Sequence, residues 1–337
     1  MRPFAYERSA DIAGAIQAGA QTGQGQTDAP TQFLAGGTTL LDLMKLDVLR
    51  PQAVVDIAPL SGLLGQIEVQ PDALRLGALA RMSDVADHPA VLRDYPVVAQ
   101  ALQLAASAQL RNMATLGGNV LQRTRCAYFR DPSFAQCNKR APGSGCAAMA
   151  GVNRNHAVLG VDASCIAQYP GDFAVALIAL DAEIELAGPG GPRVLAVADL
   201  HRDPQGQPHI ETHLNAGEVI TGFRISHAPW LRRSLYLKIR DRQSYEFALA
   251  SAAVALDLDG GVVRQARIGL GGMAYRPWRA RAAETILIGR PLDRAAAAAA
   301  AEAAFAGAVT HGRNAFKPEL GRRTLIRALL QAQRLEV

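Results

Sequence analysis

The chain has 337 residues, of which 49% are hydrophobic, 19% charged and 5% aromatic, and its formal net charge is +5. This is the composition of a globular protein long enough for two or three domains, and it excludes a disordered chain. Aromatic residues are few and no basic stripe accompanies them, which argues against a nucleic-acid partner. No apolar run has the length of a transmembrane helix, and the N-terminus lacks the apolar segment of a signal peptide. We therefore expect a soluble protein without membrane insertion and without a leader of its own.

The N-terminal third predicts short strands and helices in alternation. Residues 4–6 predict a strand, and Ser9 or Asp11 is placed to cap a helix with Ile12 and Ile16 on one face. A spacer of Gly, Gln and Thr follows at residues 21–30. The next predicted elements are a strand, turn and helix over 31–45, a buried strand at 53–57, a hairpin at 66–69 and 73–77, and helices from residue 83 and over 96–110.

Two glycine pairs stand at turns in this part of the chain. Gly36-Gly37 separates a predicted strand from a helix, and Gly117-Gly118 follows the helix predicted over 96–110. At such turns backbone N–H groups point into a concavity and a helix N-terminus adds partial positive charge, which suits a phosphate. One glycine pair before a helix is more often plain turn chemistry. Two of them in one domain suit a diphosphate that is held from both sides.

The C-terminal half predicts a second group of elements. Residues 188–215 are rich in Pro and Gly and carry no regular pattern, and residues 226–231 look like a domain boundary. The predicted elements are a helix at 173–180, strands at 182–187, 219–225, 234–240, 248–258 and 262–270, with a hairpin turn at 259–261, and helices at 295–308 and 322–335.

All four cysteines lie in one loop-rich segment, at Cys126, Cys137, Cys146 and Cys165. Disulfides are disfavoured because the chain is large and has no secretory leader. Structural zinc prefers Cys pairs two to four residues apart, and no such pair is present. Four thiolates are the usual ligands of a 4Fe-4S cluster, whose ligand spacing varies between families, so an iron–sulfur site is favoured only modestly by spacing.

Basic residues crowd the same region, and two explanations stay open. Cations near a cluster held by four thiolates would stabilise its negative charge and raise its potential. A basic face that docks an acidic partner would have the same composition. The residues are Arg111, Arg123, Arg125, Arg130, Lys139, Arg140 and Arg154.

Over essentially its whole length the chain resembles the FAD-binding subunits of molybdenum hydroxylases, the group of xanthine dehydrogenases and aldehyde oxidoreductases. It is most similar to the 4Fe-4S-containing FAD subunit of bacterial periplasmic aldehyde oxidoreductases. The motifs that carry the resemblance are AGGTTL at residues 35–40, ATLGGN at 114–119, YPGD at 169–172, KIRDR at 238–242 and the cysteine stretch at 126–146. That stretch resembles an insertion that holds an extra cluster in part of the family.

The resemblance implies an α+β fold with a two-lobed, PCMH-like FAD-binding domain and a smaller C-terminal domain of a sheet with helices. Lobe 1 would span residues 1–57 and lobe 2 residues 58–226, with the cluster insertion at about 122–168. The C-terminal domain would span residues 232–337. Substrate oxidation would occur on a partner subunit, so the resemblance implies no catalytic residue for this chain.

The resemblance also implies a cofactor role for individual residues. Backbone amides of the first glycine motif would bind the FAD diphosphate, and residues of the second would meet it from the other lobe. Asp172 would bond the ribityl chain, and Lys238 would approach the isoalloxazine edge. The implied FAD residues are Leu34, Ala35, Gly36, Gly37, Thr38, Thr39, Leu40, Ala106, Thr115, Gly118, Asn119, Leu121, Asp172, Ile220 and Lys238, and the implied cluster ligands are Cys126, Cys137, Cys146 and Cys165.

The implied function is electron transfer in a heterotrimeric molybdenum-dependent aldehyde oxidoreductase. Electrons would pass from a large molybdenum-cofactor subunit through a small 2Fe-2S subunit to the FAD of this chain and on to an external acceptor. One alternative is a xanthine or purine dehydrogenase with the same subunit, and another is an FAD protein whose cysteine loop holds zinc for docking. A non-catalytic assembly factor is a third. The compartment would be the periplasm, by co-export with a partner, or the cytoplasm.

Overall fold

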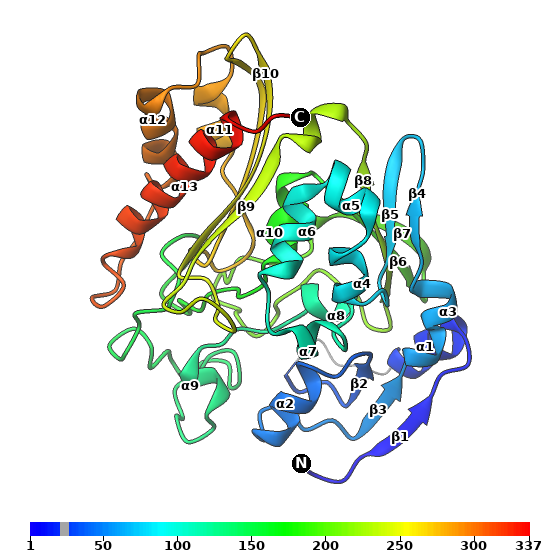
Figure 1. Ribbon diagram of the computed structural model, residues 1–337. Helices are drawn as coiled ribbons and strands as arrows, with labels where there is room; N and C mark the ends of the chain where they lie inside the picture. Colours follow the sequence, from blue (N-terminus) through cyan, green and yellow to red (C-terminus); the bar gives the residue numbers. More distant parts are fainter. Residues whose placement is uncertain (21–26) are drawn as a thin grey trace.

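The computed structural model describes residues 1–20 and 27–337, so residues 21–26 of the predicted spacer lie outside the described part. Three sheets organise the chain (Figure 1). A parallel sheet has the order β1-β3-β2, an antiparallel sheet has the order β4-β5-β8-β6-β7, and a second antiparallel sheet has the order β12-β11-β10-β9. Their strands are β1 (Ala5–Arg8), β2 (Thr31–Leu34), β3 (Ala53–Asp56), β4 (Ile67–Val69), β5 (Ala73–Gly77), β6 (Glu183–Gly188), β7 (Gly191–Ala196), β8 (Val219–Ser226), β9 (Ser234–Ile239), β10 (Ala250–Asp259), β11 (Val262–Gly271) and β12 (Trp278–Arg279).

Helices connect and cover the three sheets. The α-helices are α1 (Ile12–Gly19), α2 (Leu40–Lys45), α3 (Ser61–Leu64), α4 (Met82–Ala86), α5 (Pro89–Asp94), α6 (Pro96–Gln103), α7 (Ala108–Arg111), α8 (Leu116–Val120), α9 (Ala127–Arg130), α10 (Phe173–Ala179), α11 (Arg281–Leu287), α12 (Arg294–Ala304) and α13 (Lys317–Gln333). Short 3-10 helices lie at Ala58–Leu60, Val197–Asp199 and Pro229–Arg232. Within the described residues, no helix is both long and apolar enough to span a bilayer.

Local signals explain how the N-terminal sheet forms. The side chain of Asp11 accepts a hydrogen bond from the backbone N of Gly14 at 2.7 Å, which caps α1 as the sequence predicts. Strand β3 lies between β1 and β2 and is parallel to both. Parallel strands need crossover connections, and α1 and α2 provide them. The glycine pair Gly36-Gly37 therefore lies at the carboxyl end of β2, in front of α2.

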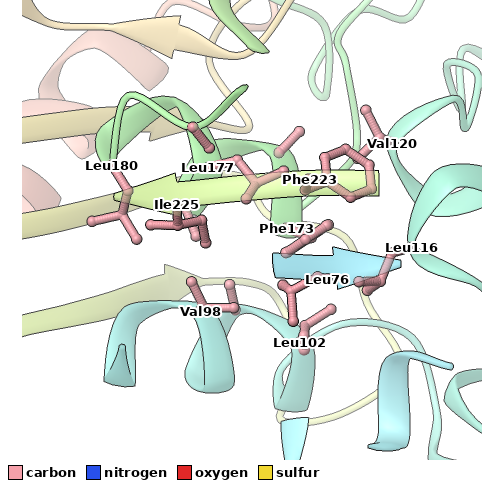
Figure 2. Close-up of a cluster of buried hydrophobic side chains, with 14 of the residues drawn as sticks. Leu76, Val98, Leu102, Leu116, Val120, Phe173, Leu177, Leu180, Phe223 and Ile225 are labelled. Atoms are coloured by element: carbon pink, nitrogen blue, oxygen red, sulfur yellow. The ribbon is translucent and has the colours of Figure 1, made fainter. Parts of the chain in front are cut away.

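The core of the second sheet fixes the second glycine segment. Helix α10 is buried along its whole length and packs beside α6, as Figure 2 shows. Leu116 and Val120 of α8 reach into the same core, next to Phe173 of α10 and Phe223 of β8. Both α8 side chains are fully buried, so the short helix is anchored firmly. This anchoring holds Thr115 and the glycines after it in place.

The C-terminal sheet lies between two groups of helices. On one face α13 packs against β9 and β10, and on the other α10 and α6 contact the same sheet (Figure 1). Glycines on β11 allow the close approach of α10, because a Cβ at Gly269 would lie 2.4 Å from Val175 O. The lysine and tyrosine of β9 are thereby brought against the N-terminus of α10, where Asp172 stands.

The α+β fold class is confirmed, and the structure differs from the predicted elements in a few places. The helix predicted over 96–110 is two helices, α6 and α7, because Ala106 between them has a φ of +48°. Ser107 then caps α7 by accepting a hydrogen bond from Leu110 N. Strand β7 lies within residues 188–215, for which no regular element was predicted. It is an edge strand, and an edge position tolerates Pro192. Helix α11 was not predicted, and α13 begins five residues before the predicted start.

Candidate functional site

The two glycine segments belong to different elements and line one cavity, since Gly36-Gly37 follows β2 and Gly117-Gly118 lies in α8. A Cβ on Gly36 would lie 1.9 Å from the backbone oxygen of Met113, so this contact requires glycine. Gly37 has a φ of +73°, in the left-handed region that favours glycine. On the other side Thr115 caps α8 and its hydroxyl accepts a hydrogen bond from the backbone N of Gly118. The two glycine pairs therefore lie at one cavity, as predicted, but the second pair is in the first turns of helix α8 and not in a turn.

Two adjoining cavities extend from this meeting point. The first, about 200 Å³ in volume, is lined by both glycine segments, and the second, about 450 Å³, extends towards α10 and the loop after β9. Thr38 and Thr39 line both cavities, so the two adjoin at the start of α2. An elongated ligand with a polar middle would fit a site of this shape.

The residues implied for a dinucleotide gather around these cavities, with two exceptions. The smaller cavity is lined by Ala35, Gly36, Gly37, Thr38, Thr39, Leu40, Thr115, Gly118, Leu121 and Ile220. The larger one is lined by Thr38, Thr39, Ala106, Asn119 and Asp172. Leu34 instead packs beside the apolar core of α2, and Lys238 lies behind Asp172.

Asp172 and Lys238 form a buried ion pair at the inner wall of the larger cavity. The Lys238 Nζ lies 2.7 Å from Asp172 Oδ2 and also donates to the Leu104 carbonyl at 3.0 Å. The Tyr236 hydroxyl donates to the other carboxylate oxygen at 2.6 Å. Burial, followed by the charge of Asp172, raises the pKa of Tyr236 well above its usual value, so the tyrosine keeps its proton. Lys238 is therefore placed to act on a ligand through Asp172.

Unpartnered polar atoms mark the cavity wall as a ligand-binding surface. The Oδ1 of Asn119 and the Nη1 of Arg123 are buried and have no hydrogen-bond partner among the described residues. Asn119 lines the larger cavity and Arg123 the smaller one. Buried polar groups without partners are costly, so both atoms fit a site completed by a polar ligand. The glycine contact at Gly36 adds a cradle that a side chain would fill, and together these features fit FAD.

The four cysteines also come together, around Cys126. Its thiol lies near those of Cys137 and Cys146, and the thiols of Cys146 and Cys165 share a hydrogen bond. A backbone bridge joins Cys137 to Cys146, and all four cysteines are free thiols. Within residues 1–20 and 27–337, no three Cys, His, Asp or Glu side chains are arranged so that they could hold one metal ion.

The surroundings of the thiols favour negative sulfur at Cys146 and disfavour it at Cys126 and Cys165. Burial raises the pKa of Cys126 to about 11, although backbone N–H groups of Phe129 and Tyr128 oppose this. The hydrogen bond from Cys165 lowers the pKa of Cys146 to about 6, and the backbone of Ile166 and Ala148 acts in the same direction. Hydrogen bonds from backbone N–H groups to sulfur are typical of thiolate ligands. These bonds stabilise negative charge on the Cys146 sulfur in particular.

A network of buried charged side chains lies next to Cys165. Lys139 Nζ lies 2.9 Å from Glu211 Oε1 and 2.7 Å from the Tyr275 hydroxyl, and its charge acts on the Cys165 thiol. Arg123 Nη2 lies 2.8 Å from the same Glu211 oxygen. Burial opposes ionisation of Glu211, but the attraction of Arg123 and Lys139 is stronger and lowers its pKa to about 2. One carboxylate thus serves two buried cations.

A second buried lysine supports the other side of the cysteine group. Lys317 Nζ donates to the carbonyls of His156 and Gly272 at 2.9 and 2.5 Å and to Gln168 Oε1 at 2.8 Å. Burial lowers its pKa to about 7. The Nε2 of His156 lies 3.1 Å from Cys126 Sγ. Lys317 therefore holds the backbone that places His156 against a thiol.

Several site residues were missed by the sequence reasoning, or were not given their observed role. Arg125 and Arg130 both bind Asp42 of α2, which ties the cysteine segment to the N-terminal lobe. Arg125 also stacks on Phe247, with 4.8 Å between its guanidinium carbon and the ring centroid. Arg125 and Phe247 line the larger cavity and a neighbouring one that includes Cys126. The available signal was that Arg125 and Phe247 follow the ATLGGN and KIRDR motifs within a few residues.

Comparison with known proteins agrees with this site. Residues 2–228 match the family described as FAD binding domain in molybdopterin dehydrogenase, and residues 235–332 match the CO dehydrogenase flavoprotein C-terminal domain. The aldehyde oxidoreductase FAD-binding subunit PaoB of Escherichia coli is 44% identical over 336 residues, covering 99% of both chains. The carbon monoxide dehydrogenase medium chain of Afipia carboxidovorans is 29% identical, covering 90% of this chain and 88% of its own.

Solved structures share the fold. A reconstituted CO dehydrogenase from Oligotropha carboxidovorans has a chain that superimposes with a TM-score of 0.75 at 24% identity, covering 98% of both chains. A quinoline 2-oxidoreductase chain from Pseudomonas putida has a TM-score of 0.73 at 24% identity, covering 99% of this chain and 98% of that one. The family match over residues 2–228 and the 44% identical relative show that this fold is that of an FAD-binding oxidoreductase subunit. The chain belongs to the FAD-binding subunits of the molybdopterin dehydrogenase family, the molybdenum hydroxylases.

Proposed function

We propose that this chain is the electron-transfer subunit of a heterotrimeric molybdenum-dependent aldehyde oxidoreductase and carries both FAD and a 4Fe-4S cluster. The observation that carries the proposal is that both glycine segments line one cavity, which adjoins a second, larger one. The 44% identity over nearly the whole length to an aldehyde oxidoreductase subunit supports the substrate class. A putative xanthine dehydrogenase FAD-binding subunit of Escherichia coli is only 24% identical over 289 residues, which disfavours a purine.

The proposed FAD site assigns a task to each part of the cavity wall. Backbone N–H groups at Gly36 and Gly37 bind the diphosphate, because amides at a glycine turn in front of a helix suit anions. Gly118, whose amide is bonded to Thr115, lines the opposite wall. The larger cavity takes the isoalloxazine ring, and Asp172, fixed by Lys238 and Tyr236, bonds the polar chain that leads to it. A bound FAD exchanges electrons singly or in pairs, which a relay between unlike partners needs.

Cys126, Cys137, Cys146 and Cys165 are the proposed ligands of the cluster. Their mutual contacts, their backbone hydrogen bonds and the buried Lys139 beside Cys165 support this assignment. The cluster insertion at about 122–168 lies against the larger cavity through Arg125. Both centres would then belong to one subunit and lie within the same wall of the fold.

The proposed partners are a large molybdenum-cofactor subunit and a small 2Fe-2S subunit. This proposal rests on the relatives, whose names describe medium chains and FAD-binding subunits. The proposed division of this chain into residues 1–57, 58–226 and 232–337 is supported by the three separate sheets. Export of the assembly to the periplasm with a partner that carries a leader stays a prediction, as does a cytoplasmic assembly.

Spectroscopy and metal analysis of the purified assembly test the proposal. We expect one FAD per copy of this chain and four iron and four sulfide per chain beyond those of the small subunit. Zinc without additional iron and sulfide would contradict the cluster and favour a docking role for the cysteine loop. Absence of stoichiometric flavin would contradict the FAD site and favour an assembly factor.

A further inference from the structure

The smaller cavity contains a cation that the glycine motifs do not explain. Among the described residues that line this cavity, Arg123 is the basic side chain. Glu218 also lines it, but both of its carboxylate oxygens are bound by Arg193, at 2.6 and 2.8 Å. Arg193 thus neutralises the charge of Glu218, and the charge of Arg123 makes this wall of the cavity positive.

The guanidinium of Arg123 is fixed at two of its three nitrogens. Nε and Nη2 donate to Glu211 at 3.2 and 2.8 Å, and Nη2 donates to the Thr27 hydroxyl at 2.8 Å. The group also lies over the Phe129 ring, with 4.7 Å to its centroid. The side chain is 6% exposed, yet Nη1 has no partner among the described residues. A rigid, buried cation with a free N–H group is complementary to an anionic oxygen.

Arg123 shares its carboxylate partner with a second buried cation. Arg123 and Lys139 share the single carboxylate of Glu211, and the remaining contacts of Lys139 are neutral oxygens of Tyr275 and Pro208. Lys139 also acts on the thiol of Cys165, so this second cation faces the cysteines and Arg123 faces the cavity. The unpartnered Nη1 of Arg123 is therefore the part of the network that is left open to an anion on the cavity side.

We propose that Arg123 is a side-chain anchor for the FAD diphosphate, with Nη1 donating a hydrogen bond to a phosphate oxygen. This inference rests on the proposed placement of FAD along the two cavities. It adds a charged contact to a diphosphate site otherwise built from backbone amides. Glu211 and Lys139 act as positioning residues, because they hold the guanidinium with its free N–H group towards the cavity.

Ligands with and without phosphate test the proposal directly. Flavin-free protein is titrated with FAD, with ADP and with riboflavin, which lacks phosphate. The variant is Arg123→Met combined with Glu211→Gln, so that no unpaired carboxylate is left behind, and the reference is Glu211→Gln alone. Arg224→Met removes an arginine from a surface ion pair with Asp72 and controls for the change in net charge. Thermal unfolding of each variant shows that it is folded.

We expect the double variant to bind FAD and ADP roughly tenfold to hundredfold more weakly than the reference, with riboflavin unchanged. Arg123→Lys, which keeps the charge but loses the planar fork, should fall between the two. An equal loss for all three ligands, or no loss for ADP, would overturn the proposal. If the parent protein binds neither FAD nor ADP, the proposed FAD site itself is wrong, and the inference fails with it.

Discussion

The dinucleotide cavities and the cysteine segment are neighbouring sites built by different means. The first is shaped by backbone, because glycine at position 36 allows it to touch the Met113 carbonyl. The second is shaped by side chains: beside the thiols, Lys139 and Lys317 make hydrogen bonds to Tyr275 and to the His156 carbonyl that span more than 100 positions in sequence. A backbone site tolerates change at most positions outside its glycines, whereas a side-chain site depends on each member of its network.

The largest expected effect comes from filling the contact between the glycine segments. In Gly36→Ala the new Cβ would overlap the Met113 carbonyl, so the two segments must move apart. We expect FAD affinity to fall roughly hundredfold, while the iron content stays unchanged. Titration of the flavin-free protein measures the loss. Gly62→Ala is the matched control, since nothing lies within 4 Å of its Cβ, and an equal loss there would refute the explanation.

Glu211 offers a test of the side-chain network through pH. Its lowered pKa, about 2 against an ordinary 4.5, means that its contribution to stability is present above about pH 4.5 and is lost as pH falls towards 2. At neutral pH this contribution is about 3 kcal/mol. We therefore expect Glu211→Gln to be destabilised at pH 7, by a margin that shrinks as the pH falls.

Denaturant unfolding of the parent and Glu211→Gln between pH 7 and pH 3 checks this expectation. A difference in unfolding free energy that is constant across the range would mean that the carboxylate is not the ionised partner of Arg123 and Lys139. Glu319→Gln, which removes an exposed carboxylate from ion pairs on α13, is the control and should have little effect.

A smaller effect is expected from Lys238, whose charge reaches the larger cavity only through Asp172. Lys238→Met leaves the Asp172 carboxylate with Tyr236 alone and makes this wall more negative. We expect FAD to stay bound and its midpoint potential to fall by roughly 30 mV, the two-electron equivalent of about 1.4 kcal/mol. Redox titration of the bound flavin measures the shift. An unchanged potential would place Lys238 outside the electrostatic reach of the ring.

The smallest effect concerns the backbone next to the cavity. Ala106 has a φ of +48°, which glycine adopts without strain. Ala106→Gly should raise the free energy of unfolding by up to about 1 kcal/mol, since relief of strain exceeds the added freedom of the unfolded chain. Ala299→Gly on the exposed face of α12 should lower it by about 1 kcal/mol. If both substitutions change the free energy of unfolding in the same direction, the backbone at Ala106 is not strained.

The same contrast explains what the sequence could predict. The glycine motifs lie in short contiguous stretches with known turn chemistry, so 35–40 and 114–119 could be assigned before the fold was known. Glu211 could not be assigned as the partner of Arg123 and Lys139, because it lies in the Pro- and Gly-rich stretch that has no periodic pattern. Lys238 could be assigned to the site by resemblance, but its position behind Asp172 depends on how β9 packs against α10.

The most direct test of the account is a crossed measurement of flavin and iron in two variants of the assembled enzyme. In Cys126→Ser we expect iron and sulfide of the extra cluster to be lost together and FAD to remain near one per chain. In Gly36→Ala we expect the reverse, with iron retained and flavin largely lost. Loss of both cofactors in both variants, or full iron content in Cys126→Ser, would contradict two separately built centres in one subunit.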